Sequence, residues 1–250
     1  ITRSIPSAET LRQRMDDIGS SLRKNILDAN VEMFHTDNIE PTPISEDFVP
    51  VDLDVTPMDN SKKHKEGVSY TYKEFFGYAP MMSYIGAEGF LANTELREGS
   101  QHCQCNTPAF LSETLNYSHQ LTKKQLLVRM DSGNDAAENL GILIEDGSWF
   151  IVKRNLRRGE SKQKWLDKAK KCCQDIRHPR DGKTVYVGSS RKDVNYTDFE
   201  GNSKTITMRI VYEVIERTMD KNGQFLILPD IECNTFWTNL DWNDDAVIKG

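Results

Sequence analysis

The chain has 250 residues, of which 37% are hydrophobic and 28% are charged, and its formal net charge is −6. This length and balance predict one large globular domain or two small ones, with enough apolar residues for a core. No apolar run approaches the roughly 18 residues of a membrane span. No signal segment opens the chain, and the spacing of the five cysteines predicts no disulfide framework. We therefore expect a cytoplasmic protein that does not associate with membranes.

The N-terminal part is predicted to be helical and to end in a linker. Ser7 can cap a helix over residues 7–34, in which apolar residues recur at helical spacing. Residues 38–43 contain two prolines, which resist helix formation and favour an extended connection. We assign residues 1–45 to this segment.

Residues 46–154 alternate between strand-like and helix-like patterns. Strands are predicted over 48–58, 77–85, 90–96, 125–130 and 149–153, and helices over 107–120 and from about 136 to 145. Strands joined by tight turns pair antiparallel, whereas strands joined through helices are usually parallel. The order of elements therefore predicts an α/β fold with a mixed five-stranded sheet and helices on its faces.

Residues 155–240 are predicted to form a second, β-rich module. A basic helix over 162–173 precedes strand-like stretches at 184–188, 205–215, 224–228 and 232–240. Residues 241–250 have the pattern of a helix cap followed by an acidic first turn. Because the chain begins at Ile1 and ends in this helix start, we expect it to be a fragment of a longer protein.

The positive charge is concentrated in one region of an acidic chain. Residues 153–192 contain fourteen Lys or Arg and four acids. Such a block is typical of a surface that binds phosphates, and it is also compatible with an ordinary solvated helix face. The charge alone does not distinguish these two interpretations.

Three aspartates have positions that fit metal chemistry. Asp52 and Asp54 lie two apart on a predicted strand and so share one face of it, whereas Asp131 directly follows another predicted strand. If these strands are neighbours, carboxylates from both can bind a pair of divalent ions that catalyses phosphodiester displacement. The alternatives are an exposed polar strand face for Asp52 and Asp54, and a helix cap for Asp131.

Four motifs of the chain resemble the DDE transposases of bacterial insertion sequences, whose catalytic core is RNase H-like. They are Val51-Asp-Leu-Asp-Val-Thr-Pro-Met-Asp-Asn-Ser61, Gly77-Tyr-Ala-Pro80, Glu95-Leu-Arg-Glu-Gly99 with Gln101-His102, and Leu127-Val-Arg-Met-Asp-Ser-Gly-Asn134. The resemblance covers most of the chain. It implies an RNase H-like mixed five-stranded sheet, and a β-rich insertion that matches residues 155–240.

The resemblance also implies a site and a reaction. Asp54 is the first catalytic and metal-binding acid, with Asp52 as the fallback, and Asp131 is the second. Two Mg²⁺ or Mn²⁺ ions would support cleavage of double-stranded DNA at transposon ends and attack of the freed 3′-hydroxyl on target DNA, with a homodimer as a possible form of the DNA complex. The phosphate contacts implied are Lys153, Arg154, Arg157, Arg158, Lys162 and Lys164, with Lys62, Lys63 and Lys65 as further candidates.

One part of the family pattern is missing. The third acid of the family is a Glu in a signature that begins Tyr-x-x-Arg, and none of the eight tyrosines is followed by Arg at that spacing. We expect this acid after Gly250 and expect the fragment to be inactive alone. Two alternatives are a DNA-binding remnant without catalysis and an RNase H-like nuclease without strand transfer. A zinc site at His102-Cys103-Gln-Cys105 lacks a second ligand pair.

Overall fold

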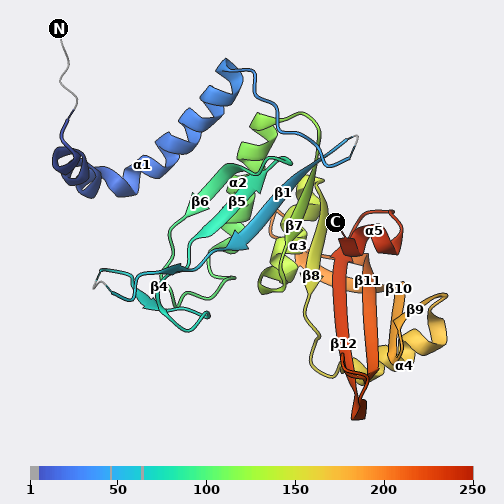
Figure 1. Cartoon of the computed structure of the whole chain (residues 1–250). Helices are drawn as coiled ribbons and strands as arrows, with labels where there is room; N and C mark the ends of the chain where they lie inside the picture. The colour runs from blue at the N-terminus through green and yellow to red at the C-terminus, as the bar shows by residue number, and fades with distance from the viewer. Residues whose placement is uncertain (1–5, 46, 63–64, 250) are drawn as a thin grey trace.

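The computed structural model describes residues 6–45, 47–62 and 65–249 (Figure 1). The first element, α1 (Ala8–Thr36), begins where the Ser7 hydroxyl accepts a hydrogen bond from the Thr10 amide at 3.2 Å, which confirms the predicted cap. The C-terminal half of α1 packs on the body of the protein through the buried residues Leu27, Val31 and Phe34. The N-terminal half extends away from the body (Figure 1).

A nine-stranded mixed sheet organises the chain after α1. Its strands are β1 (Phe48–Val55), β5 (Met81–Ile85), β6 (Phe90–Glu95), β7 (Gln125–Met130), β8 (Trp149–Arg154), β9 (Asp175–Arg180), β10 (Lys183–Thr197), β11 (Ser203–Met219) and β12 (Phe225–Thr238). They lie in the order β6-β5-β1-β7-β8-β12-β11-β10-β9. β7 is parallel to both β1 and β8, and the other neighbours pair antiparallel.

The two faces of the sheet are covered differently. The main core lies on one face, where β1, β7 and β8 contribute residues such as Val51, Val128 and Val152 under α2 (Thr107–Leu121), α3 (Ala137–Asp146) and α4 (Lys162–Cys172). On the opposite face, Leu127 and Ile151 belong to a smaller cluster with α5 (Asp244–Lys249). No helix in the described ranges has both the length and the apolar character needed to cross a membrane.

A small three-stranded sheet follows β1. It consists of β2 (Met58–Asp59), β3 (Ser69–Tyr70) and β4 (Phe76–Tyr78), in the order β2-β4-β3. Two glycines permit close backbone contacts here, because a Cβ on Gly77 would lie 2.0 Å from the Met58 carbonyl oxygen and one on Gly99 would lie 2.3 Å from the Ser69 carbonyl oxygen. Both positions therefore require glycine.

The prediction of a five-stranded sheet beside a separate β-rich module is wrong in one respect. The five predicted core strands are present, but the later strands extend the same sheet, because β12 pairs antiparallel with β8 in a register that places Trp237 opposite Val152. The predicted strands 224–228 and 232–240 form the single strand β12. β9, which was not predicted, forms the far edge of the sheet. The pairing of β12 with β8 joins segments that are far apart in the chain, and such pairing leaves no local pattern in a sequence.

Candidate active site

Asp54 and Asp131 lie at the carboxyl ends of two adjacent parallel strands. β1 and β7 pair so that Leu53 lies opposite Met130, and each aspartate is the next residue along the chain. The preceding pair on the same face, Asp52 and Arg129, is joined directly by hydrogen bonds, so the aspartates also share this face. The structure therefore brings together the two acids that the sequence analysis selected.

The Asp131 carboxylate affects the ionisation of Asp54. Partial burial raises the pKa of Asp54, and the negative charge of Asp131 raises it further, while Lys73 acts in the opposite direction. Asp131 Oδ1 accepts hydrogen bonds from the Gly133 amide at 3.0 Å and from Asn134 Nδ2 at 2.8 Å. The bond from the Gly133 amide caps the short helix η1 (Ser132–Asn134), so the capping role and a position at the site coexist in Asp131.

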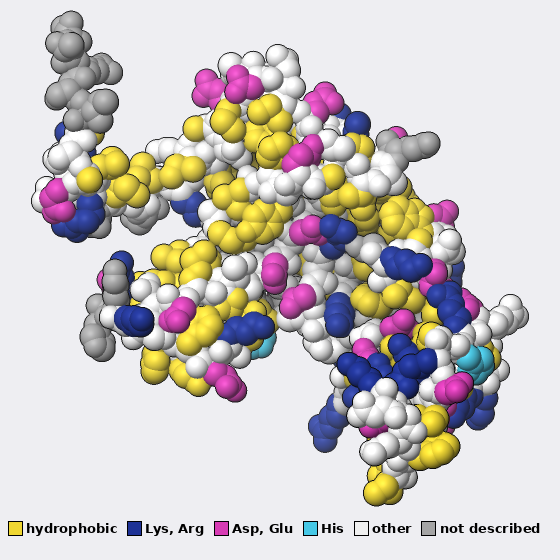
Figure 2. All heavy atoms as spheres, in the orientation of Figure 1, with side chains coloured by type: hydrophobic (Ala, Val, Ile, Leu, Met, Phe, Trp, Pro, Cys, Tyr) yellow, Lys and Arg dark blue, Asp and Glu magenta, His cyan; other side chains and the backbone are white. Residues whose placement is uncertain are grey.

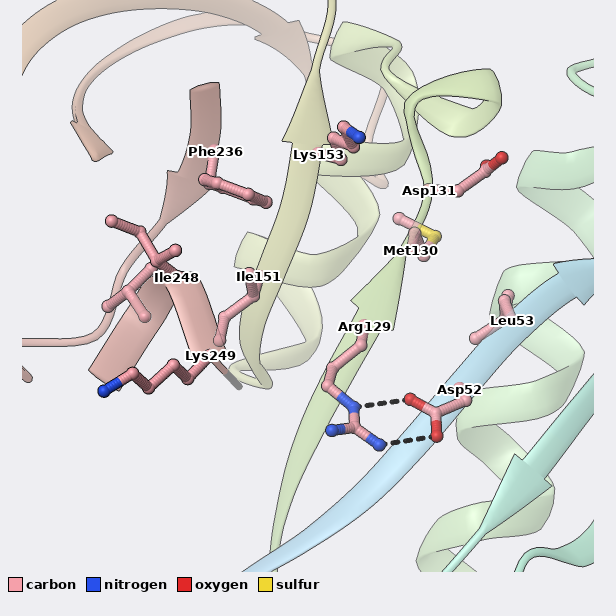
Figure 3. Close-up of a pocket in the computed structure, with 11 residues that line it drawn as sticks. Asp52, Leu53, Arg129, Met130, Asp131, Ile151, Lys153, Phe236, Ile248 and Lys249 are labelled. Atoms are coloured by element: carbon pink, nitrogen blue, oxygen red, sulfur yellow. Dashed lines mark hydrogen bonds and ion pairs between the residues drawn. The ribbon is translucent and has the colours of Figure 1, made fainter. Parts of the chain in front are cut away.

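Asp52, the fallback first acid, already has a partner. Its two carboxylate oxygens accept hydrogen bonds from Arg129 Nε and a terminal nitrogen of Arg129, both at 2.6 Å (Figure 3). This bidentate pair neutralises Asp52 and holds β1 to β7. Asp54 is therefore the better candidate for a metal ligand.

A cavity of about 290 Å³ lies between the acid-bearing strands and the C-terminal elements (Figure 3). Asp131 and Arg129 of the β7 region and Lys153 of β8 line one side of it, and Ile248 and Lys249 of α5 line another. The exposed ammonium group of Lys153 thus borders the same space as the Asp131 carboxylate. Asp54 is not among the residues that line this cavity, so Asp131 is the member of the acid pair that borders it.

A second cavity, of about 710 Å³, borders Asp131 on the side of the small sheet. Its lining includes Tyr72, which is 64% exposed, and Cys103. Burial raises the pKa of Tyr72, and the charges of Asp54 and Asp131 raise it further. Tyr72 was not predicted as a site residue, because its approach to the acids depends on the fold of the small sheet.

The four motifs that carry the family resemblance meet around the acid pair. The first begins on β1 and contains Asp54, and the fourth contains Asp131. The other two are paired through an isolated bridge between Tyr78 and Glu98, and residues of both line the second cavity together with Asp131. Within the third motif, the buried Arg97 donates to the Glu95 carboxylate at 2.7 Å and to the Cys103 carbonyl at 3.0 Å. This network fixes the loop that leads to the second cavity.

The described residues supply two acids to this site and no complete metal-binding cluster. Among them, no group of three or more His, Cys, Asp or Glu side chains is placed to hold a metal ion. The described residues therefore supply neither a third acid at this site nor a zinc site at Cys103 and Cys105, which are free thiols.

The predicted phosphate contacts differ in their accessibility. The prediction that Arg154 contacts phosphate is wrong, because its side chain is fully buried. It pairs with Glu160 at 2.7 Å and lies over the rings of Trp165 and Trp237. Arg157 is partly exposed and is bound to Asp135. The exposed predicted residues are Lys153, Arg158, Lys162, Lys164, Lys62 and Lys65. Lys63 lies outside the described residues.

Asp135 was missed by the sequence analysis and joins three segments. Its side chain is fully buried, and it accepts hydrogen bonds from Trp237 Nε1 of β12 at 3.0 Å, from Arg157 at 2.7 Å and from the Asn155 amide at 2.7 Å. Asn155 also donates to the Ser132 carbonyl oxygen at 2.5 Å. The loop after β8, which carries much of the basic block, is thereby fastened to the loop that carries Asp131.

Comparisons with known proteins do not show a family. No family model matches the chain. The tRNA-specific 2-thiouridylases MnmA of two Leptospira interrogans strains, of serovars copenhageni and Lai, are each 34% identical over 123 residues, which are 46% of this chain and 29% of theirs. The chain thus spans less than a third of the length of the curated relatives it matches. A piggyBac transposase synaptic complex with hairpin DNA has a TM-score of 0.36 and 11% identity, over 91% of this chain and 41% of that chain. These likenesses are too partial or too distant to support a function.

Proposed function

We propose that the chain is the catalytic core of a DDE-type DNA transposase, in which Asp54 and Asp131 are the first two metal-binding acids. The observation that carries this proposal is their placement at the carboxyl ends of the adjacent parallel strands β1 and β7. Ligand and catalytic sites of α/β sheets commonly lie at such strand ends. The convergence of the four transposase-like motifs on this point supports the same assignment.

The architecture is compatible with the RNase H-like core that this resemblance implies. Five neighbouring strands, in the order β6-β5-β1-β7-β8, form a mixed sheet with α2 and α3 on one face. The face that carries the acids has only α5 near it among the described helices. An extended substrate such as a DNA duplex would approach the acids from this face.

The carboxylates of Asp54 and Asp131 are of the ligand type that fits Mg²⁺ or Mn²⁺. Both ions prefer carboxylate oxygens. Partial burial raises the pKa of Asp54 and the charge of Asp131 raises it further, so a bound cation would favour the ionised form of this carboxyl. When bound, a pair of such ions would polarise the scissile phosphate and stabilise both the attacking and the leaving oxygen. α5 lines the cavity beside Asp131 from the other side, and the third acid that the family resemblance implies belongs to the same proposal.

The chain's own residues would hold and orient the DNA backbone. Lys153 borders the acid cavity, and Arg158, Lys162 and Lys164 continue the exposed positive charge along the loop and α4. Lysine and arginine contacts to phosphates position a duplex without reading its sequence. Because Asp135 and the Arg154–Glu160 pair fix this loop, bound phosphates would keep a constant distance from the acids.

Mn²⁺ binding to this chain is the direct test of the acid pair. We expect calorimetry or electron paramagnetic resonance to detect Mn²⁺ binding that Asp54→Asn or Asp131→Asn weakens at least about tenfold, because each removes a charged ligand. Asp59→Asn is the matched control, since Asp59 is an exposed acid of the small sheet. Equal Mn²⁺ affinity in all variants would remove the pair from the proposal.

Labelled DNA substrates test the reaction class. End cleavage followed by strand transfer of labelled transposon-end DNA would support a transposase, and cleavage without transfer would support an RNase H-like nuclease. DNA binding with no cleavage, unaffected by Asp131→Asn, would support a non-catalytic remnant.

A further inference from the structure

An apolar stripe runs along the exposed side of α1. It consists of Leu11, Met15, Ile18, Leu22, Ile26, Ala29 and Met33. At 100° per residue, these positions fall within about 40° of one line on the helix surface. The largest exposed members, Leu11, Met15, Ile18, Ile26 and Met33, are each between 47% and 61% exposed.

The stripe does not serve the packing of α1 onto its own chain. Leu27, Val31 and Phe34, which contact the body, lie on the opposite side of the helix. Among the described side chains of α1, the first buried one is Leu27. A helical segment that lacks tertiary packing is marginal in water, and a contiguous exposed apolar surface usually marks an interaction site.

A groove accompanies the second half of the stripe. Leu22, Ile26 and Met33 form one wall, and Leu91 and Leu96 of the β6 region form the other, around a volume of about 580 Å³. β6 is the edge strand of the sheet, and it is tied to α1 by Asn30, which donates to the Leu91 carbonyl at 3.0 Å. The groove has the apolar character of a site that receives an amphipathic helix.

The spacing of the stripe is symmetric about Leu22. Going outward from Leu22, Ile18 matches Ile26, Met15 matches Ala29 and Leu11 matches Met33, each pair at equal distance. Two copies of α1 that lie antiparallel with Leu22 opposite Leu22 would therefore place an apolar residue opposite each apolar residue. Such a pairing is isologous, as a two-fold axis requires.

The charges beside the stripe fit the same register. Arg14 and Glu32 are both exposed and lie on the same flank of the stripe, about 80° from its centre line. In the antiparallel register centred on Leu22, Arg14 of one copy lies within two residues of Glu32 of the other, or about 3 Å along the axis. Two such ion pairs, one at each end, would favour the antiparallel orientation.

We propose that α1 is the dimerisation element of this protein, and that a second copy of the chain occupies the groove. The N-terminal half of each α1 lies along the groove of its partner, so that the half without packing in one chain gains a contact surface from the other. This association concerns the free protein and does not depend on the proposed catalysis.

Sedimentation equilibrium of the 250-residue chain tests the proposal. We expect a dimer at micromolar concentrations, and we expect Ile18→Lys to raise its dissociation constant at least about tenfold, because the two-fold axis places the substitution twice in the interface. Gln13→Lys is the matched control, since Gln13 is exposed on the opposite side of α1 and should leave the dimer unchanged. Circular dichroism establishes that both variants remain folded.

Two further variants test the register. Leu22→Cys should form a disulfide-linked dimer on mild oxidation because it faces its own copy, whereas Gln13→Cys should cross-link no more than the parent, whose five cysteines are free. Arg14→Glu and Glu32→Arg should each weaken the dimer, and the double variant should restore it. A monomeric parent, a dimer that Ile18→Lys leaves intact, or equal cross-linking of both cysteine variants would overturn the proposal.

Discussion

Replacing Glu160 with Gln should destabilise the protein in a way that depends on pH. Burial opposes ionisation of Glu160, yet hydrogen bonds from the Arg154 side chain and the Arg157 amide, together with the charge of Arg154, lower its pKa from 4.5 to about 2. Glu160 is 24% exposed and its partner Arg154 is fully buried. The substitution leaves the Arg154 guanidinium between two tryptophan rings without its counter-ion.

The magnitude follows from the pKa. A fall from 4.5 to about 2 corresponds to about 3 kcal/mol of stability at pH 7, at about 1.4 kcal/mol per pKa unit. A depressed carboxyl pKa contributes stability that is fully present above the unfolded value of 4.5 and is lost as the pH falls towards 2. At pH 3.5, the same contribution is about 2 kcal/mol. Loss of one partner of a buried ion pair typically costs a similar amount.

Urea unfolding of the parent and of Glu160→Gln, at several pH values from 7 to 3.5, measures this contribution. We expect a difference of about 3 kcal/mol at pH 7 that narrows as the pH falls. Glu40→Gln, a change at an exposed glutamate, should stay within about 0.5 kcal/mol of the parent. A difference below about 1 kcal/mol at pH 7, or one that grows on acidification, would refute the role assigned to the pair.

Three further results are expected. Asp54→Asn should increase the free energy of unfolding of the metal-free protein at pH 7, because a raised carboxyl pKa means that the ionised group disfavours the folded state. This gain in stability should vanish below about pH 3.8, and a loss of stability at pH 7 would contradict the prediction. Trp237→Phe removes the hydrogen bond to the buried Asp135 and should cost about 1.5–3 kcal/mol in urea unfolding, whereas Trp242→Phe should cost less. Combined Lys153→Ala and Arg158→Ala should lower the slope of log affinity for duplex DNA against log salt by about two, and an unchanged slope would place the DNA elsewhere.

The local elements of the fold could be predicted from the sequence, but the joining of the sheet could not. The alternation at 48–55 and the apolar run at 125–130 gave β1 and β7, because period and burial are properties of the residues themselves. The continuity of the sheet depends on the pairing of β12 with β8, in which the paired residues are more than 80 positions apart in the sequence. Pairing at that separation is decided by packing over the whole domain.

In the candidate site, too, some residues could be predicted from the sequence and others could not. Asp54 and Asp131 could be selected because each follows or ends a recognisable strand, and the pairing of Leu53 with Met130 then brings them together. Arg154 was assigned to phosphate binding because charge in a sequence carries no sign of burial, whereas in the structure it lies under α4 beside Trp165. Asp135 resembled an ordinary loop residue, since its three partners lie on two other segments.

The continuous antiparallel pairing from β8 through β12 to β11 and β10 forms an extension of the sheet whose length can change. The turn at residues 220–224, which joins β11 to β12, lies far along both strands from the junction with β8. Adding two residues to each strand near this turn would lengthen this extension by about 7 Å and keep every existing side chain on its original face. The acid pair would stay where it is, because the added residues lie at the end of the strands remote from β8.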